Sequence, residues 1–128
     1  MNPAAVGTVY PEISFAVDPE QVAAFRDVFG QAEGVPPTFV TAAEFTVFPQ
    51  VLGDPNLALD FTRVVHGSQD YRFERPLREG ETLSVRARID SIRIKGASGF
   101  LTVVMELFDA DGTLVCTARS QMVERGPV

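Results

Sequence analysis

The segment from Thr38 to Phe48 is apolar almost all the way round, and this feature constrains the fold most. A helix with so little polar surface has to be buried. Pro49 is expected to end it, because proline lacks an amide proton and restricts the residue before it. The remaining chain can cover such a helix only with a sheet that curls around it, since the rest of the sequence is mainly β-rich.

A shorter amphipathic helix is predicted before it, over residues 19–29. Asp18 offers an N-cap side chain, Pro19 suits the first helical position, and Gln21 completes a capping box. Apolar residues recur at helical spacing up to Phe29, and Gly30 is placed to stop the helix. The run Ile13–Val17 ahead of it is expected to be an edge strand.

The second half of the chain has the composition of strands. Segments 65–73, 83–94, 100–108 and 114–123 are β-rich and bounded by turn residues, which predicts four antiparallel strands in a row. The apolar residues occupy odd positions up to Ile89 and even positions from Ile92, so a bulge is expected near Ser91. Glycine and acidic residues in 95–99 and 109–112 favour tight hairpins.

These elements predict one α+β domain over residues 1–128 with the hot-dog arrangement, a long antiparallel sheet wrapped around a buried central helix. A chain of 128 residues has the usual size of one domain. The sheet leaves an exposed edge, and pairing of two such sheets removes it. A dimer or pseudo-dimer is therefore expected.

Composition excludes several classes of function. A net charge of -6 leaves no basic face for nucleic acid. No segment is apolar enough to span a membrane or to serve as a leader, so a cytoplasmic location is expected. Cys116 reads as a small core residue. His66 is the sole histidine, and no feature indicates a metal or redox-cofactor site; no cofactor is expected.

Two motifs carry a resemblance to a known family. Pro36-Pro37-Thr38-Phe39 opens the buried helix, and the run from Val65 to Leu83 reads VHGSQDYRFERPLREGETL. The chain resembles, over nearly its whole length, the FAS1-like, MaoC-type dehydratase domain. Relatives of that type include (R)-specific enoyl-CoA hydratases and the noncatalytic subunit of the mycobacterial heterodimeric 3-hydroxyacyl-ACP dehydratase. Structure alone explains part of the run, because Arg75-Pro76 leads into a turn and Gly80 supplies a positive φ.

The catalytic pair of that family is missing. Its catalytic members carry a motif resembling D-x-N-P-x-H after the first helix, whose Asp and His activate a water molecule. Here residues 29–37 read FGQAEGVPP and contain no histidine. Asp54, in Gly53-Asp54-Pro55-Asn56, has similar neighbours but follows the buried helix, so it is interpreted as a loop turn.

The resemblance therefore implies a noncatalytic acyl-thioester-binding subunit of a heteromeric (R)-specific enoyl-CoA hydratase or 3-hydroxyacyl-thioester dehydratase. A second hot-dog subunit would supply the Asp and His, and the ligand would be an acyl-CoA or acyl-carrier-protein thioester. Amides at the start of the Thr38 helix favour a thioester oxygen. Loss of the overhanging loop would make the tunnel roomier. The residues expected to bind substrate are Thr38, Phe39, Thr41, His66, Gly67, Gln69 and Tyr71.

Alternatives remain open for several of these residues. On a regular strand His66 would share a face with Asp70 rather than with Gln69 and Tyr71. Glu44 on the buried helix could act as base or nucleophile of a homodimeric acyl-CoA thioesterase. The other interpretation is that it forms a T-x-x-E cap with Thr41 or points to solvent at the subunit seam.

A catalytically inactive acyl-CoA-binding homodimer is a third possibility for the whole chain. Four aromatic residues either line an acyl tunnel or belong to the core, and aromatic side chains at such spacings are more often core. They are Phe39, Phe45, Phe48 and Phe73.

Overall fold

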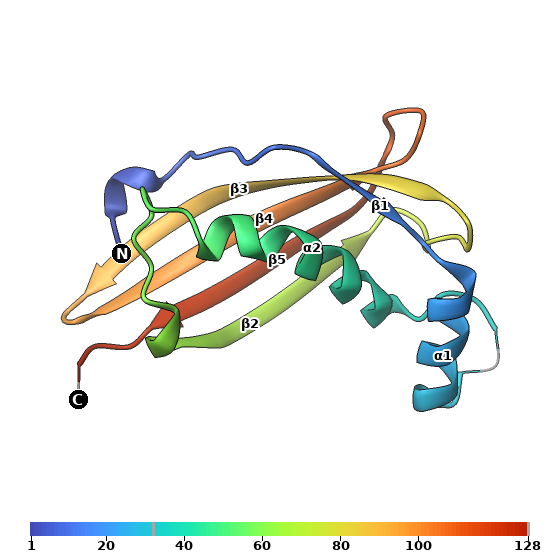
Figure 1. Ribbon diagram of the computed structural model, residues 1–128, viewed down its shortest axis with the longest axis horizontal. Coiled ribbons are helices and arrows are strands. Elements are labelled where there is room, and N and C mark those ends of the chain that lie inside the picture. Colours follow the sequence, from blue (N-terminus) through green and yellow to red (C-terminus); the bar gives the residue numbers. More distant parts are fainter. Residues whose placement is uncertain (32, 128) are drawn as a thin grey trace.

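The structure, a computed structural model, describes residues 1–31 and 33–127, which form one antiparallel five-stranded sheet with a helix across one face (Figure 1). The sheet order is β1-β3-β4-β5-β2. In chain order the main elements are β1 (Ile13–Ala16), α1 (Pro19–Phe29), η2 (Pro37–Val40), α2 (Thr41–Leu52), β2 (Val64–Phe73), β3 (Thr82–Lys95), β4 (Ser98–Phe108) and β5 (Leu114–Glu124). Two further 3₁₀ turns are η1 (Pro3–Ala5) and η3 (Phe61–Arg63).

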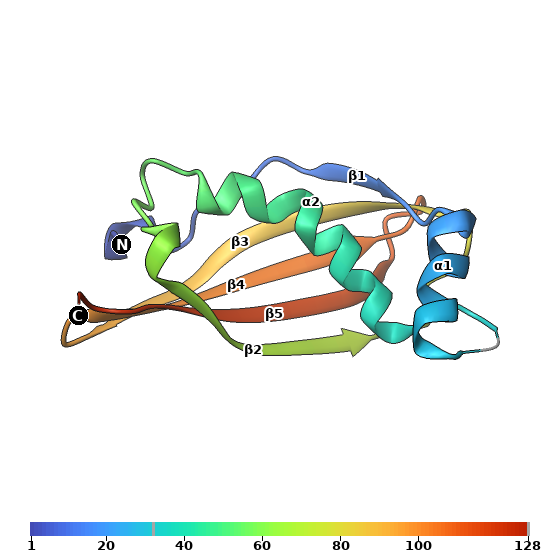
Figure 2. The same ribbon diagram turned by 60° about the horizontal axis from the view of Figure 1, so that its bottom comes forward.

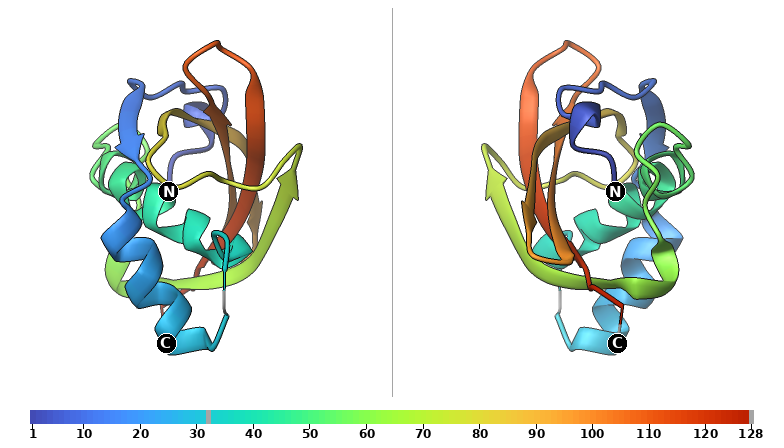
Figure 3. Two further views of the ribbon diagram at one scale, coloured as in Figure 1. Left: turned by 90° about the vertical axis from the view of Figure 1, so that its right-hand side faces the viewer. Right: turned by 90° about the vertical axis from the view of Figure 1, so that its left-hand side faces the viewer.

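The α+β hot-dog arrangement predicted from the sequence is confirmed. In the end-on views the sheet curves around α2, and β2 passes along one side of the helix (Figure 3). All four predicted strands are present, each within two residues of its predicted bounds. Their order in the sheet differs from a simple row, because β2 pairs with β5 and not with β3. This crossover places β2 on the far edge, where it can flank the helix.

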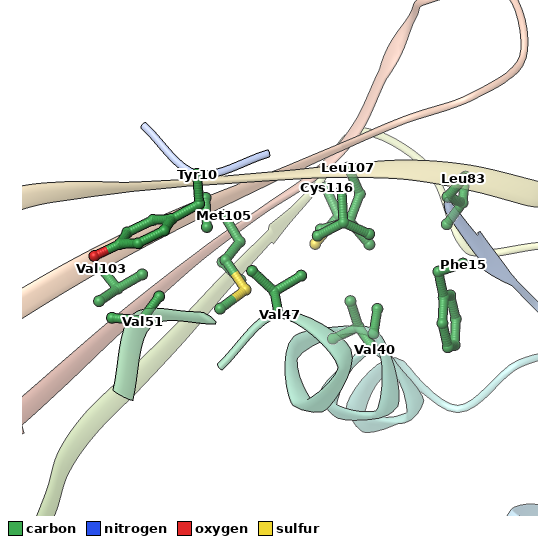
Figure 4. Packing of buried hydrophobic residues seen from close by; sticks show 14 of the residues in the cluster. Tyr10, Phe15, Val40, Val47, Val51, Leu83, Val103, Met105, Leu107 and Cys116 are labelled. Carbon is green, nitrogen blue, oxygen red and sulfur yellow. The ribbon is translucent and has the colours of Figure 1, made fainter. Parts of the chain in front are cut away.

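The core lies between α2 and the concave face of the sheet. Val40, Val47 and Val51 point from the helix segment toward the sheet, where Met105 and Leu107 meet them (Figure 4). All five side chains are completely buried. Burying each such side chain stabilises the fold by roughly 1.5–3 kcal/mol. Cys116 lies among them on β5, as the alternation of that strand predicted.

The buried helix differs from its prediction at both ends. It begins with the 3₁₀ turn η2, and α2 runs through Pro49 to Leu52 instead of ending at the proline. Proline removes the hydrogen bond to the carbonyl of Phe45 and crowds that carbonyl, and burial of Val51 on the next turn offsets this cost. Nor is the helix covered all round, because Phe45 is 66% exposed.

The first helix matches its predicted bounds, residues 19–29. The side chain of Asp18 accepts a hydrogen bond from the amide of Glu20 (3.0 Å), and Gly30 ends α1 with a φ of 70°. The helix lies at one end of the sheet, beyond the start of α2 (Figure 2). Of the helices in residues 1–31 and 33–127, none has the length and apolar content needed to cross a membrane.

The predicted bulge in β3 is confirmed. Ile89 pairs with Val103 and Ser91 with Thr102, so Asp90 is the extra residue on β3. Ile92 then faces the same side as the buried Leu101, its partner on β4. The bulge therefore keeps apolar side chains on the concave face although their parity in the sequence changes.

Candidate functional site

A cavity of about 440 Å³ opens between α2 and β2, near the start of the helix. The helix segment supplies one wall and the edge strand supplies the other. Most of the lining residues carry a polar group, and the exceptions are two phenylalanines whose ring centroids lie 6.3 Å apart. The lining residues are Thr38, Thr41, Glu44, Phe45, Phe48, His66, Gln69 and Tyr71.

A bulge in β2 brings His66 to this cavity. His66 pairs with Met122 and Ser68 with Gln121, so Gly67 is the extra residue on β2. His66 consequently lines the same cavity as Gln69 and Tyr71. The expectation that His66 shares a face with Asp70 is wrong, because it assumed an unbroken strand. Gly67 suits this position, since a Cβ there would lie only 3.3 Å from the carbonyl oxygen of Gln121.

Glu44 is the centre of a buried polar network. Its side chain is 1% exposed; one carboxylate oxygen accepts a short hydrogen bond from the hydroxyl of Tyr71. The other oxygen lies 3.0 Å from the hydroxyl of Ser120 on β5. The hydroxyl of Thr41 lies 3.0 Å from that of Tyr71 and extends the network toward the cavity. The two non-catalytic interpretations of Glu44 are both wrong. It does not form a cap with Thr41, because α2 has no side-chain cap, and it does not point to solvent, because it is buried.

The hydroxyl of Ser120 has two acceptors within reach but only one proton. It lies 3.0 Å from Oε2 of Glu44 and 2.5 Å from Oε1 of Gln69. With Glu44 protonated, Glu44 donates to Ser120 and Ser120 donates to Gln69. With Glu44 ionised, Ser120 donates to the carboxylate, and the Gln69 amide has to turn over and donate to Ser120. In both states one polar atom of the Gln69 amide lacks a partner. In the orientation seen here that atom is the buried Nε2, which has no hydrogen-bond partner within residues 1–31 and 33–127.

Burial sets the electrostatics of this network. It raises the pKa of Glu44 above its ordinary value, and the hydrogen bonds from Tyr71 and Ser120, together with the nearby Gln69 amide and the charge of His66, offset that rise only in part. Burial also raises the pKa of Tyr71, and its hydrogen bond to Glu44 adds to the effect. Tyr71 therefore acts as a hydrogen-bond donor and not as a base.

A second, apolar cavity of about 390 Å³ continues the groove toward the end of α2. It shares Phe45, Phe48 and His66 with the polar cavity. Among its other lining residues are Leu52, Phe61, Val64 and Met122. The groove between α2 and β2 thus has most of its polar side chains at one end and is almost wholly apolar at the other.

The structure separates the predicted binding residues into two groups. Thr38, Thr41, His66, Gln69 and Tyr71 line the polar cavity. Phe39 and Gly67 do not; Phe39 is 2% exposed and packs edge-on against Phe25 at 5.5 Å, and Gly67 forms the bulge.

The remaining candidates have clear places. Phe45 is exposed, contrary to the core interpretation, and Phe73 lines a separate cavity with Pro36 and Leu77. Asp54 forms the loop turn that was expected, accepting from the amide of Asn56 at 2.8 Å.

Sequence reasoning missed Ser120 as a member of the site. Cys116, Ala118 and Met122 alternate inward along β5, and Ser120 occupies the same parity. A polar residue in an inward-facing series is a signal that could have found it. Within the described part of the chain, no group of three or more histidine, cysteine and acidic side chains is arranged to hold a metal ion.

Comparison with known sequences finds one family and a group of relatives. The sequence model of the FAS1-like, dehydratase domain region matches residues 16–118. A UPF0336 protein of Saccharopolyspora erythraea is 37% identical over 111 residues, which span 85% of this chain and 68% of that protein. A UPF0336 protein of Streptomyces coelicolor is 32% identical over 98% of this chain and 95% of its own length.

Solved structures with the same fold include dehydratases and hydratases. The C-terminally truncated HadBC (3R-hydroxyacyl-ACP dehydratase) complex of Mycobacterium tuberculosis matches with a TM-score of 0.79 and 22% identity over 93% of this chain and 96% of that chain. A MaoC-like dehydratase matches with a TM-score of 0.83 and 17% identity, over 96% of this chain and 43% of its own. The (R)-hydratase of A. caviae matches with a TM-score of 0.66 and 16% identity, over 93% and 95% of the two chains.

Proposed function

This chain belongs to the family of FAS1-like dehydratase domains, among the MaoC-like hot-dog dehydratases, and on that premise we propose that it is a noncatalytic subunit. Its role is to bind an acyl thioester within a heteromeric (R)-specific enoyl-thioester hydratase or 3-hydroxyacyl-thioester dehydratase of fatty-acid or related acyl metabolism. The chain acts as one hot-dog domain, and a second hot-dog subunit supplies the catalytic Asp and His.

One observation carries the noncatalytic part of the proposal. Hydration of an enoyl thioester needs an acid and a base within reach of one water molecule. His66 is the sole histidine, and the carboxylate beside its cavity, Glu44, is buried with both oxygens hydrogen-bonded. A carboxylate held in this way bridges the helix and the sheet, and its 1% exposure keeps it from acting as a free base on a substrate. The same observation argues against a thioesterase that uses Glu44 as its base.

Exposed apolar side chains beside the groove support the need for a partner. Phe45 is 66% exposed on α2, Phe61 is 64% exposed, and Val65 on β2 is 41% exposed. In the described part of the chain, β2 also has no strand on its outer side. Exposed apolar surface next to an open strand edge is typical of a protein interface. A second hot-dog subunit covers both features when its sheet continues from β2.

The test combines an activity assay with one variant at the proposed interface and one control variant on α1. The purified chain, a catalytic hot-dog subunit and their mixture are each incubated with short and long 2-enoyl-CoA, following loss of the enoyl group and release of thiol. We expect hydration to rise when the two chains are mixed. Val65→Asp, on β2 and outside both cavities, should abolish that gain, while Val28→Asp should keep it, because Val28 is 77% exposed but lies on α1.

Each of the other outcomes would indicate a different function for this chain. Hydration by the chain alone would overturn the noncatalytic role. Thiol release that Glu44→Gln removes would identify a thioesterase. A homodimer that binds acyl-CoA, turns over neither substrate and ignores the catalytic chain would be the inactive acyl-CoA-binding protein.

A further inference from the structure

The contact between Gln69 and Ser120 depends on a proton of a third residue. Oε1 of Gln69 lies 2.5 Å from the hydroxyl of Ser120, and only the Ser120 proton makes that contact a hydrogen bond. Ser120 can give this proton to Gln69 only while a protonated Glu44 donates to Ser120 across 3.0 Å. An ionised Glu44 takes the Ser120 proton, and two oxygens without a proton between them would then face each other. The Gln69 amide cannot keep this orientation in that state.

The second oxygen of Glu44 behaves in the same way in both protonation states. It accepts a short hydrogen bond from the hydroxyl of Tyr71, which lies 3.0 Å from that of Thr41. Tyr71 has one proton and gives it to Glu44, so Thr41 is the donor of the second contact. A change in the protonation of Glu44 therefore reverses only the branch that runs through Ser120 and ends at Gln69.

Gln69 carries this change to the groove between α2 and β2. Its side chain lines the polar cavity together with that of Glu44, and in the described part of the chain its Nε2 has no hydrogen-bond partner. Loss of the Glu44 proton makes Nε2 the better partner for Ser120 and leaves Oε1 without one. The Gln69 side chain thus has two arrangements, and each suits only one protonation state of Glu44.

We propose that the proton on Glu44 is a switch for the wall of this groove. In the protonated state the Gln69 amide bonds to Ser120 through its oxygen, and in the ionised state it turns over and bonds through its nitrogen. Binding of an acyl thioester is coupled to the switch, because a ligand that displaces water from the cavity lined by Glu44 favours the uncharged carboxyl. The coupling rests on the proposed function, whereas the switch itself needs no ligand.

The other groups around Glu44 leave one competing charge within the described residues. The titratable side chains near it are Tyr71 and His66 on β2 and Cys116 on β5, and the inward-facing residues of β1, β3 and β4 are apolar. Burial raises the pKa of Tyr71 and that of Cys116, so both stay uncharged where carboxyl groups titrate. The charge of His66 favours the ionised form of Glu44. Its effect therefore has to be separated from that of the switch.

Solution NMR of the ligand-free chain, isotope-labelled at glutamate and glutamine, tests the switch. The carboxyl carbon of Glu44 and the side-chain amide of Gln69 are followed from about pH 4 to about pH 9. We expect both to titrate with one midpoint. Above it, the Gln69 amide protons should exchange with water more slowly relative to those of Gln21, which is exposed on α1. Glu44→Gln should remove this pH-dependent slowing.

Two serine variants provide the matched comparison. Ser120→Ala removes the hydroxyl that links the two groups, so Glu44 should still titrate while the slowing at Gln69 disappears. Ser68→Ala, the same change at the adjacent exposed position of β2, should keep the slowing. The switch would be overturned by a Glu44 that does not titrate, by equal exchange at Gln69 on both sides of the midpoint, or by slowing that persists in Ser120→Ala. The unaltered protein alone decides the matter if Ser120→Ala does not fold.

Titration calorimetry with decanoyl-CoA tests the coupling to ligand. At the Glu44 midpoint, measurements in two buffers of different ionisation enthalpy give the number of protons taken up on binding. We expect the unaltered chain to take up as much as about half a proton more than Glu44→Gln, whose remaining uptake belongs to His66 and the ligand. The affinity of the unaltered chain should fall as the pH rises above the midpoint, by at most about tenfold per pH unit.

The two measurements separate the inference from the proposed function. Equal proton uptake by the unaltered chain and by Glu44→Gln would overturn the coupling and leave acyl-thioester binding intact. Absence of binding, by the chain alone and by its mixture with the catalytic subunit, would overturn the proposed function and the coupling together. The NMR comparison decides the switch in either case, because it uses no ligand.

Discussion

The hydroxyl of Ser120 on β5 lies 3.0 Å from a carboxylate oxygen of Glu44 on α2, although 76 positions separate the two residues in the chain. This contact ties the central helix to the sheet through a polar bond inside an otherwise apolar core. Buried polar groups that are fully paired hold an arrangement in place, and they destabilise it when one partner is removed.

Glu44 should make stability depend on pH. Because burial raises its pKa in the folded state, the folded chain holds this proton at pH values where the unfolded chain has lost it. The stability contribution is complete below the ordinary carboxyl pKa and is lost as the pH rises through the raised value. The titratable side chains near Glu44 are those of Tyr71, His66 and Cys116.

The variant Glu44→Gln imitates the protonated side chain, since its amide donates to Ser120 while its oxygen accepts from Tyr71. Thermal midpoints from about pH 5 to about pH 8 should fall less in the variant than in the unaltered protein. Glu44→Ala serves as the control and should lose roughly 1–3 kcal/mol, because Tyr71 and Ser120 then lack an acceptor. Parallel pH profiles for Glu44→Gln and the unaltered chain would contradict this assignment.

Phe39 and Phe45 should respond oppositely to truncation although they lie six residues apart in one apolar segment. Phe39 is 2% exposed and packs against Phe15 and Phe25, so Phe39→Ala should destabilise the chain by about 3–5 kcal/mol. Phe45 is 66% exposed, and Phe45→Ala should change the stability of the isolated chain by about 0.5 kcal/mol or less. Urea unfolding of the monomer measures both, and similar losses would refute the one-sided burial of the segment formed by η2 and α2.

The Glu81 carboxylate should stabilise the folded chain at neutral pH, and this stabilisation should be lost in acid. Its own burial raises its pKa, but hydrogen bonds from Arg75 (2.6 and 3.0 Å) and from the Arg78 amide (2.5 Å) outweigh burial and lower the pKa overall. A lowered folded pKa gives stability that is present above the ordinary carboxyl pKa and lost as the pH falls through the lowered value. Glu81→Gln should lose roughly 1–2 kcal/mol at pH 7 and little in strong acid. A constant difference across the acid range would show that the charge is irrelevant.

The thiol of Cys116 should not react with thiol reagents in the folded protein. Burial raises the pKa of its thiol to about 12, and the charge of Glu44 adds to that rise. The side chain is completely buried, so a thiol reagent at pH 8 should react only as fast as the chain opens. The reaction should become immediate in denaturant. Rapid labelling of the native protein would mean that β5 opens locally far more often than a core strand does.

Local pattern was sufficient for the elements themselves. The cap at Asp18, the stop at Gly30, the bulge near Ser91 and the bounds of the strands each depend on a few neighbouring residues, and all were predictable. The failure at the end of the central helix has a tertiary origin. Pro49 does not end α2, because the burial of Val51 beyond it outweighs one missing hydrogen bond, and that burial is a tertiary property.

The sequence alone therefore determined the elements, the concave core and the absence of a second histidine. Only the tertiary structure decided the site. The extra residue Gly67 turned His66 toward the cavity, the pairing of β2 with β5 brought Gln69 opposite Ser120, and the packing of α2 placed Glu44 between Tyr71 and Ser120. Strand order, register and helix rotation are set by contacts between residues far apart in the chain, so local periodicity does not contain them.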